Sequence, residues 1–137
     1  MRLLNINGKS VSKNVSKYLI DWDGISKSKL QFKVKLFLKN YWYKYICYEE
    51  FPVYGTRMKV DFLNASKKIA IEVHGRQHNE FNKHFQGNRS GFYFQIKRDA
   101  DKMDWLGKNG IRLIEIYEEE IPKISEGFFL EKFGLRI

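Results

Sequence analysis

The chain has 137 residues, of which 43% are hydrophobic and 16% aromatic, and this composition predicts one folded domain. The formal net charge of +9 favours a polyanionic partner, and nucleic acid is the usual one. No apolar run reaches the length of a membrane span, which excludes an integral membrane protein, and the single cysteine, Cys47, excludes an intramolecular disulfide. We therefore expect a cytoplasmic protein that binds nucleic acid and does not contact a membrane.

The first part of the chain is polar and rich in lysine. We expect residues 1–27 to form an ordered basic arm and residues 28–137 to form a single domain. Ser28 and Gln31 have the spacing of a capping box, which predicts a helix over residues 29–43. An extended aromatic stretch then ends at Pro52, and this is typical of an edge strand.

The centre of the chain is a predicted β-hairpin, in which a polar turn at residues 64–68 joins two strands, residues 58–63 and 69–74. Strand side chains alternate between two faces, and the apolar set of the first strand is Met58, Val60 and Phe62. The opposite face of the hairpin then receives Asp61, Glu72 and His74. Two acids and a histidine on one face are costly unless a cation lies among them, so we expect the chemistry here.

The remainder of the chain alternates between helix and strand. A polar loop is expected to about residue 90, followed by a helix over residues 95–108, a strand over 111–117 and a last helix over 124–133. The expected buried side of the helix over residues 95–108 holds Ile96, Ala100, Met103, Leu106 and Gly107. The order of elements predicts an α/β fold with a central mixed sheet flanked by helices.

The acids and histidines resemble the site of the PD-(D/E)xK nucleases. Asp61 followed by Glu72-Val73-His74 matches the two-acid pattern of that superfamily, with a histidine where a lysine normally stands. Further matching motifs follow in order: Gly75, His78, Lys97-Arg98-Asp99 and Leu106 to Ile116. This order is similar to that of very-short-patch-repair (Vsr) endonucleases and of the phage homing endonucleases described as EDxHD. The resemblance covers about residues 28–121 and implies a restriction-endonuclease-like core and a metal-dependent DNA endonuclease.

The resemblance also implies the ligands of a catalytic metal. The carboxylates of Asp61 and Glu72 and the carbonyl of Val73 are the expected ligands of Mg²⁺, for which Mn²⁺ could substitute. His74 and His78 are expected to handle protons or the scissile phosphate, and which of them is the general base stays open.

Three further residues complete the expected catalytic group. Asp99 is expected to orient a histidine. The family often has a glutamate on its first helix, and this chain has Gln31 there, which cannot carry that charge. Glu50, at the start of the predicted hairpin region, is the other candidate for the carboxylate.

Double-stranded DNA is the expected partner. Phosphate contacts are expected from six basic residues: Arg57, Arg76, Lys97, Arg98, Lys102 and Lys108. A separate recognition module is not visible, so target selection requires a homodimer, a partner module or loops of this domain. The resemblance implies a phage-encoded protein acting in the cytoplasm of a bacterial host. Two alternatives stay open: a nuclease-fold protein that binds nucleic acid without cleavage, and a repair nuclease specific for mismatched or branched DNA.

Overall fold

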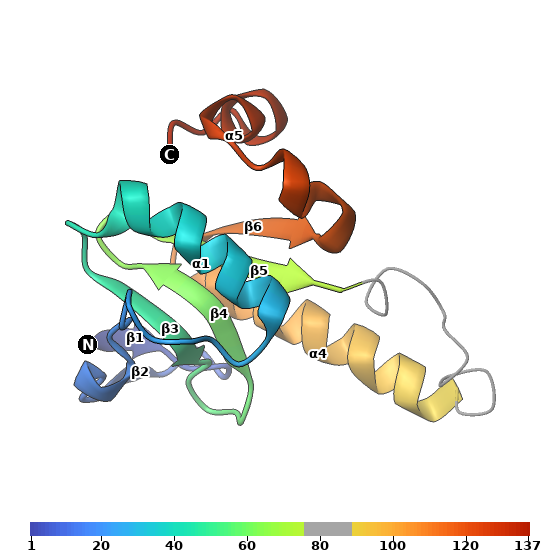
Figure 1. The fold of residues 1–137 in the computed structure, drawn as a ribbon. Coiled ribbons are helices and arrows are strands. Elements are labelled where there is room, and N and C mark those ends of the chain that lie inside the picture. Colours follow the sequence, from blue (N-terminus) through green and yellow to red (C-terminus); the bar gives the residue numbers. More distant parts are fainter. Residues whose placement is uncertain (76–88) are drawn as a thin grey trace.

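A four-stranded sheet lies at the centre of the computed structural model, which describes residues 1–75 and 89–137 (Figure 1). The strands are β3 (Cys47–Pro52), β4 (Lys59–Asn64), β5 (Ile69–His74) and β6 (Arg112–Tyr117). They stand in the sheet in that order; β4 is antiparallel to both β3 and β5, and β6 is parallel to β5. The prediction of an α/β fold with a central mixed sheet is confirmed.

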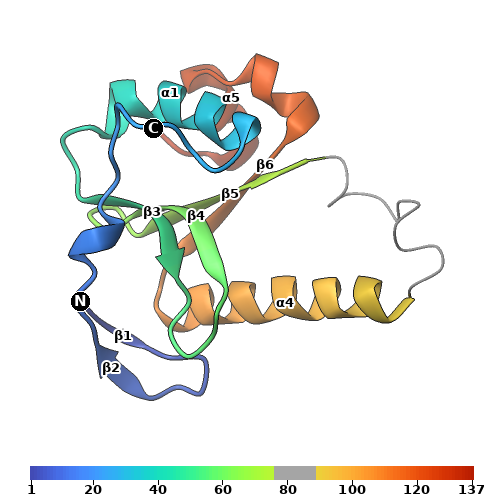
Figure 2. The same ribbon diagram turned by 60° about the horizontal axis from the view of Figure 1, so that its bottom comes forward.

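Helices cover both faces of this sheet. Helices α1 (Lys29–Trp42) and α5 (Glu126–Phe133) lie on one face, and α4 (Arg89–Lys108) lies on the other (Figure 2). α4 belongs to the connection between β5 and β6, as a parallel strand pair requires a crossover of this kind. The short 3-10 helix η2 (Glu118–Lys123) follows β6 and leads to α5.

Each face of the sheet has its own hydrophobic cluster. The cluster toward α1 and α5 includes Val34, Leu38, Trp42, Phe62, Ile71 and Phe129. The cluster toward α4 includes Phe51, Val60, Leu63, Ala70, Trp105 and Leu106. Because both faces are covered, a charged side chain in a central strand needs a partner or a place at the end of the sheet.

The N-terminal arm is ordered, as predicted, and contains elements that the sequence did not indicate. Strands β1 (Arg2–Leu4) and β2 (Ser10–Ser12) form an antiparallel hairpin, and the 3-10 helix η1 (Ser16–Tyr18) follows. Trp105 Nε1 donates to the Leu4 carbonyl at 2.7 Å, and the Leu4 amide donates to Asn109 Oδ1 at 2.8 Å. The hairpin is therefore held against the end of α4. Strands of three residues carry too little alternation to be predicted.

The capping box predicted at the start of α1 is only half present. The Ser28 hydroxyl accepts from the Gln31 amide at 3.1 Å, as expected. The Gln31 side chain points instead to β3, where Nε2 donates to Glu49 and Glu50. The helix start is confirmed, and Gln31 is tied to the sheet.

The predicted buried side of α4 is confirmed at Leu106, which is 1% exposed, and is wrong at the other four positions. Ile96 is 49% exposed and Met103 is 52% exposed, and Ala100 and Gly107 are exposed as well. α4 extends well beyond the sheet, so its C-terminal part is what contacts the core (Figure 2). An apolar pattern indicates which side of a helix can be buried, but it does not indicate how much of the helix length the sheet covers.

The predicted face of β4 is also partly wrong. Phe62 packs toward α1, whereas Met58 and Val60 pack toward α4, so the strict alternation fails between residues 60 and 62. The β3–β4 ladder pairs Glu49 with Phe62 and Phe51 with Val60. Between these pairs, Glu50 has a φ of 54°, in the left-handed region that non-glycine residues rarely adopt. Because the backbone turns at Glu50, the residues on either side of this point in β3 and β4 direct their side chains to opposite faces of the sheet.

Candidate active site

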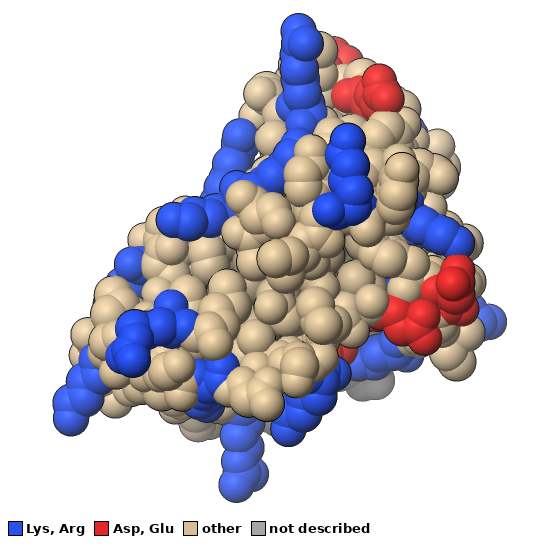
Figure 3. Space-filling view, turned by 90° about the vertical axis from the view of Figure 1, so that its left-hand side faces the viewer, with Lys and Arg blue, Asp and Glu red and all other residues tan. Residues whose placement is uncertain are grey.

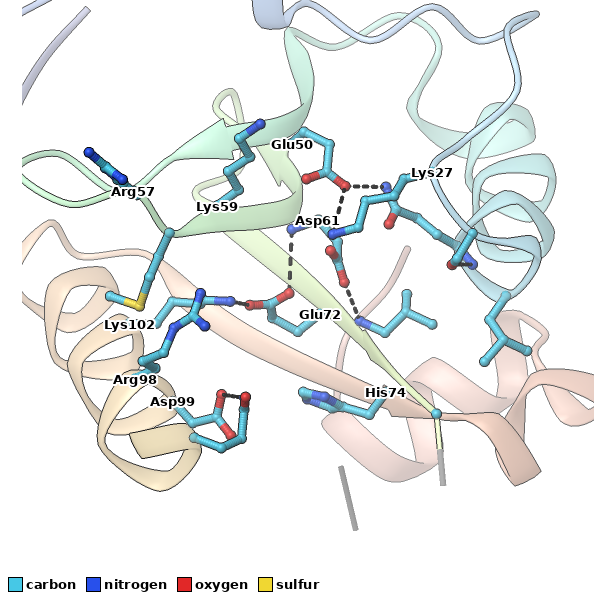
Figure 4. Close-up of a pocket in the computed structure, with 17 residues that line it drawn as sticks. Lys27, Glu50, Arg57, Lys59, Asp61, Glu72, His74, Arg98, Asp99 and Lys102 are labelled. Atoms are coloured by element: carbon cyan, nitrogen blue, oxygen red, sulfur yellow. Dashed lines mark hydrogen bonds and ion pairs between the residues drawn. The ribbon is translucent and has the colours of Figure 1, made fainter. Parts of the chain in front are cut away.

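A pocket of about 580 Å³ opens where β4 and β5 separate, between α4 and the start of α1. Its lining includes Gln31, Glu50, Asp61, Glu72, His74, Asp99 and Lys102 (Figure 4). These residues come from two helices and three strands, and the sequence predicted a functional role for all of them. The structure therefore brings most of the described candidates into one cavity.

The Asp61 carboxylate lies at the point where the β4–β5 ladder ends. The last ladder pair is Phe62 with Ile71, so a continued register would place Asp61 opposite Glu72. Instead, the Val73 amide donates to Asp61 Oδ2 at 2.8 Å, and Glu72 Oε2 accepts from the Asp61 amide at 3.4 Å. At this point hydrogen bonds from backbone amides to side-chain carboxylates replace the hydrogen bonds between backbones, and they hold both carboxylates in place.

Ionising both acids of the Asp61–Glu72 pair is electrostatically unfavourable. Burial raises the pKa of Asp61 to about 8, with further contributions from the Glu72 and Glu50 charges, while the Val73 amide acts in the opposite direction. Glu72 is also buried, with 6% of its surface exposed. A cation placed beside the pair would favour the ionised form of both acids.

The structure supplies such a cation from α4. Lys102 Nζ forms an ion pair with Glu72 Oε1, and the Lys102 side chain is 19% exposed (Figure 4). The sequence indicated Lys102 only as a phosphate contact, because nothing in the spacing tells that α4 crosses beside β5.

His74 lies at the end of β5 and is buried. Its Nε2 is 3.2 Å from Glu115 Oε1 on β6, and its ring stacks on Tyr117 at a centroid distance of 5.3 Å. Asp99, the predicted orienting acid, lines the same pocket and accepts from Gln95 Nε2 at 3.1 Å. Glu115 is thus an acid in contact with the His74 ring that the sequence analysis did not indicate. Its signal was a lone acid in an otherwise apolar strand.

Gln31 and Glu50, the two candidates for the position of the family's helix glutamate, lie in contact on one side of the pocket. Gln31 is 3% exposed, and its Nε2 lies 3.2 Å from Glu50 Oε1, which also lies 3.9 Å from Lys27 Nζ. The carboxylate on this side of the pocket is thus that of Glu50, and the amide of Gln31 holds it.

A buried ion pair lies behind Gln31, and no sequence pattern indicates it. Lys35 is 1% exposed, and its Nζ contacts Glu49 Oε1 at 2.9 Å. The same glutamate accepts from Ser26 Oγ at 2.5 Å and from Gln31 Nε2 at 2.9 Å. This network fixes the start of α1 against β3.

The predicted phosphate contacts divide into two groups. Arg57, Arg98 and Lys102 line the pocket. Lys97 and Lys108 form ion pairs along α4, with Asp101 and Asp104 respectively. The remaining candidate base, His78, and the remaining phosphate contact, Arg76, lie outside the described residues. Further Lys and Arg side chains are spread over the face shown in Figure 3, so the basic charge is not confined to the pocket.

The acid pair fits Mg²⁺ by its chemistry. Among residues 1–75 and 89–137, no group of three or more His, Cys, Asp and Glu side chains is arranged to hold a metal ion. Mg²⁺ commonly binds through one or two carboxylates and keeps several waters, so Asp61 and Glu72 can suffice. Burial and the neighbouring acids raise the pKa of Asp61 to about 8, and a cation bound at this position would favour its ionised form.

Two viral proteins match part of the sequence. The uncharacterized protein 033L of Invertebrate iridescent virus 3 is 32% identical over 65 residues, which is 47% of this chain and 34% of that protein. The uncharacterized protein 094L of Frog virus 3 (isolate Goorha) is 39% identical over 66 residues, which is 47% of this chain and 43% of that protein. The chain therefore spans less than half the length of these relatives.

The other comparisons give no match. No family model matches the sequence, and no solved structure matches the chain. In the part that the structure describes, none of the helices is long and apolar enough to cross a membrane. The relatives are viral, and the expectation of a cytoplasmic protein encoded by a phage stays a prediction.

Proposed function

We propose that this protein is a metal-dependent DNA endonuclease with a restriction-endonuclease-like core, of the Vsr-like or phage homing type. The observation that carries the proposal is the meeting of Asp61 and Glu72 in one buried pocket, at the end of the β4–β5 ladder. Ionising both acids there is unfavourable, since the pKa of Asp61 is raised to about 8. Such a pair is suited to a divalent cation.

The metal ligands in this proposal are Asp61, Glu72 and the Val73 carbonyl. A bound Mg²⁺ or Mn²⁺ would supply charge neutralisation at the scissile phosphate and a more acidic water. The Val73 amide fixes the Asp61 carboxylate by a 2.8 Å hydrogen bond, so this ligand is already oriented. Orientation before binding lowers the cost of assembling the reactive geometry.

Proton transfer is assigned to His74, with His78 as the second candidate. Glu115 contacts His74 Nε2 at 3.2 Å and limits the rotation of the ring. Arg57 and Arg98 line the same pocket and are suited to contact the phosphates on either side of the cleaved bond. Specificity then depends on a homodimer, a partner module or loops of the domain.

A second function is favoured by two observations. Lys102 already neutralises Glu72, and Gln31 stands where the family often has an acid, as in a protein that binds nucleic acid without cleaving it. Cleavage assays separate the two functions. Supercoiled plasmid, linear duplex, mismatched duplex and a four-way branch should each be incubated with Mg²⁺, Mn²⁺ or EDTA.

The endonuclease is supported by nicks or breaks that require the metal and disappear with EDTA. Cleavage restricted to the mismatched or branched substrate would identify a repair nuclease. A mobility shift on every substrate, without cleavage under any condition, would overturn the endonuclease in favour of the binding protein.

A further inference from the structure

Lys102 differs from the other lysines of α4 in where its ammonium lies. In the Lys97–Asp101 and Lys108–Asp104 pairs, the side chains are between 35% and 71% exposed. The pair that Lys102 makes is with another element, and its Glu72 side chain is only 7% exposed. A lysine in this position neutralises an acid of the pocket.

Both carboxylate oxygens of Glu72 are engaged. Oε1 contacts Lys102 Nζ, and Oε2 accepts from the Asp61 backbone amide. Each oxygen keeps a second lone pair, so a metal ion could bind beside the amide, but a divalent ion on Glu72 and the Lys102 ammonium would repel each other at close range. The amide is fixed within β4, whereas the ammonium stands on a flexible four-carbon side chain. Lys102 is the partner that can leave.

We propose that Lys102 is an exchangeable counter-cation, which occupies Glu72 in the metal-free protein and moves to a DNA phosphate when a divalent ion takes its place. This inference rests on the proposed function. An ammonium released inside a pocket needs another anion, and the phosphate of a bound duplex is the anion that enters there. The other acids on the lining already accept hydrogen bonds: Asp61 from the Val73 amide, Glu50 from Gln31 and Asp99 from Gln95.

The exchange couples metal binding to DNA binding. Without DNA, the metal competes with Lys102 for Glu72, so the apparent affinity of the protein for the metal is reduced. With DNA, the phosphate holds Lys102 away and the affinity rises, and by linkage the metal strengthens DNA binding by the same factor. Coupling of this kind is typically about 5- to 150-fold, and we expect about tenfold here.

Calorimetric titration of the full chain with Ca²⁺, with and without a short duplex, tests the exchange. Ca²⁺ is used because it takes oxygen ligands and its binding is measured without cleavage. Lys102→Met should bind Ca²⁺ about tenfold more tightly than wild type in the absence of DNA, and the effect of DNA should nearly vanish. Lys39→Met is the matched control, because Lys39 pairs with Asp23 on the surface and lies outside the pocket lining.

The outcomes separate this inference from the proposed function. If Asp61→Asn abolishes Ca²⁺ binding but Lys102→Met binds as wild type does or more weakly, the exchange is wrong and the metal site stands. If wild type binds no Ca²⁺ with or without DNA, both proposals fail. Thermal unfolding checks the fold of each variant, and Lys102→Gln, which should behave as Lys102→Met does, replaces it if that variant does not fold.

Discussion

The buried acid pair predicts an unusual dependence of stability on pH. The pKa of Asp61 rises on folding from its ordinary value of 3.8 to about 8, so between these values the folded state holds a proton that the unfolded state has released. Stability from this group is fully present below the lower value and is lost as the pH rises toward the upper one. The loss is about 1.4 kcal/mol for each pH unit.

Asp61→Asn removes this titration and keeps the shape, because an asparagine oxygen can still accept from the Val73 amide. Between pH 5 and pH 7, wild type should lose about 3 kcal/mol of unfolding free energy relative to Asp61→Asn. That is a large share of the roughly 5–15 kcal/mol of a typical domain. Urea unfolding in EDTA at several pH values measures the difference, in which titrations common to both proteins cancel.

Two controls sharpen this experiment. Asp23 is exposed and its pKa is lowered by Lys39, so Asp23→Asn should show no comparable slope between pH 5 and pH 7. Saturating Mg²⁺ should flatten the wild-type curve, because a bound cation favours the ionised acids. A difference between wild type and Asp61→Asn that stays constant across this range would refute the electrostatic argument.

Three other predictions concern catalysis and binding. His74→Ala should lower the cleavage rate by about 10² to 10⁴, and an unchanged rate would move the role to His78. Glu115→Gln should lower the rate less than His74→Ala does, and a partial rescue of His74→Ala, but not of Glu115→Gln, by added imidazole would identify Glu115 as a positioning residue. Duplex affinity should fall steeply with salt, and Arg98→Ala should flatten the logarithmic salt dependence by about one unit, whereas an affinity indifferent to salt would contradict a phosphate contact.

Periodicity predicted most of the fold, because the sheet strands and the longer helices each bury enough side chains to leave a pattern. The central hairpin, the helix that begins at Lys29 and the strand after Gly110 all lie where the sequence indicated. The start of α4 at Arg89 and the three-residue strands of the N-terminal arm were missed. The strands of the arm depend on tertiary contacts, such as the hydrogen bond from Trp105 Nε1 to the Leu4 carbonyl, which short local patterns do not carry.

The candidate site was predictable where it depends on strand alternation and not where it depends on packing. Glu72 and His74 share the face of β5 toward α4, as their spacing indicates. The left-handed backbone at Glu50 has no signal in the sequence, and it changes the face of the neighbouring strand residues. The contact between Lys102 and Glu72 requires knowledge of how α4 crosses the sheet.

The central claim is that Asp61 and Glu72 together hold the metal that cleaves DNA. Mg²⁺-dependent nicking of plasmid by wild type, Asp61→Asn and Glu72→Gln, with mobility shifts on the same DNA, tests it most directly. We expect that wild type cuts, that both variants bind with similar affinity, and that each cuts at least about 10²-fold more slowly because ligand charge is lost. Near-wild-type cleavage by either variant at saturating Mg²⁺ would contradict the account.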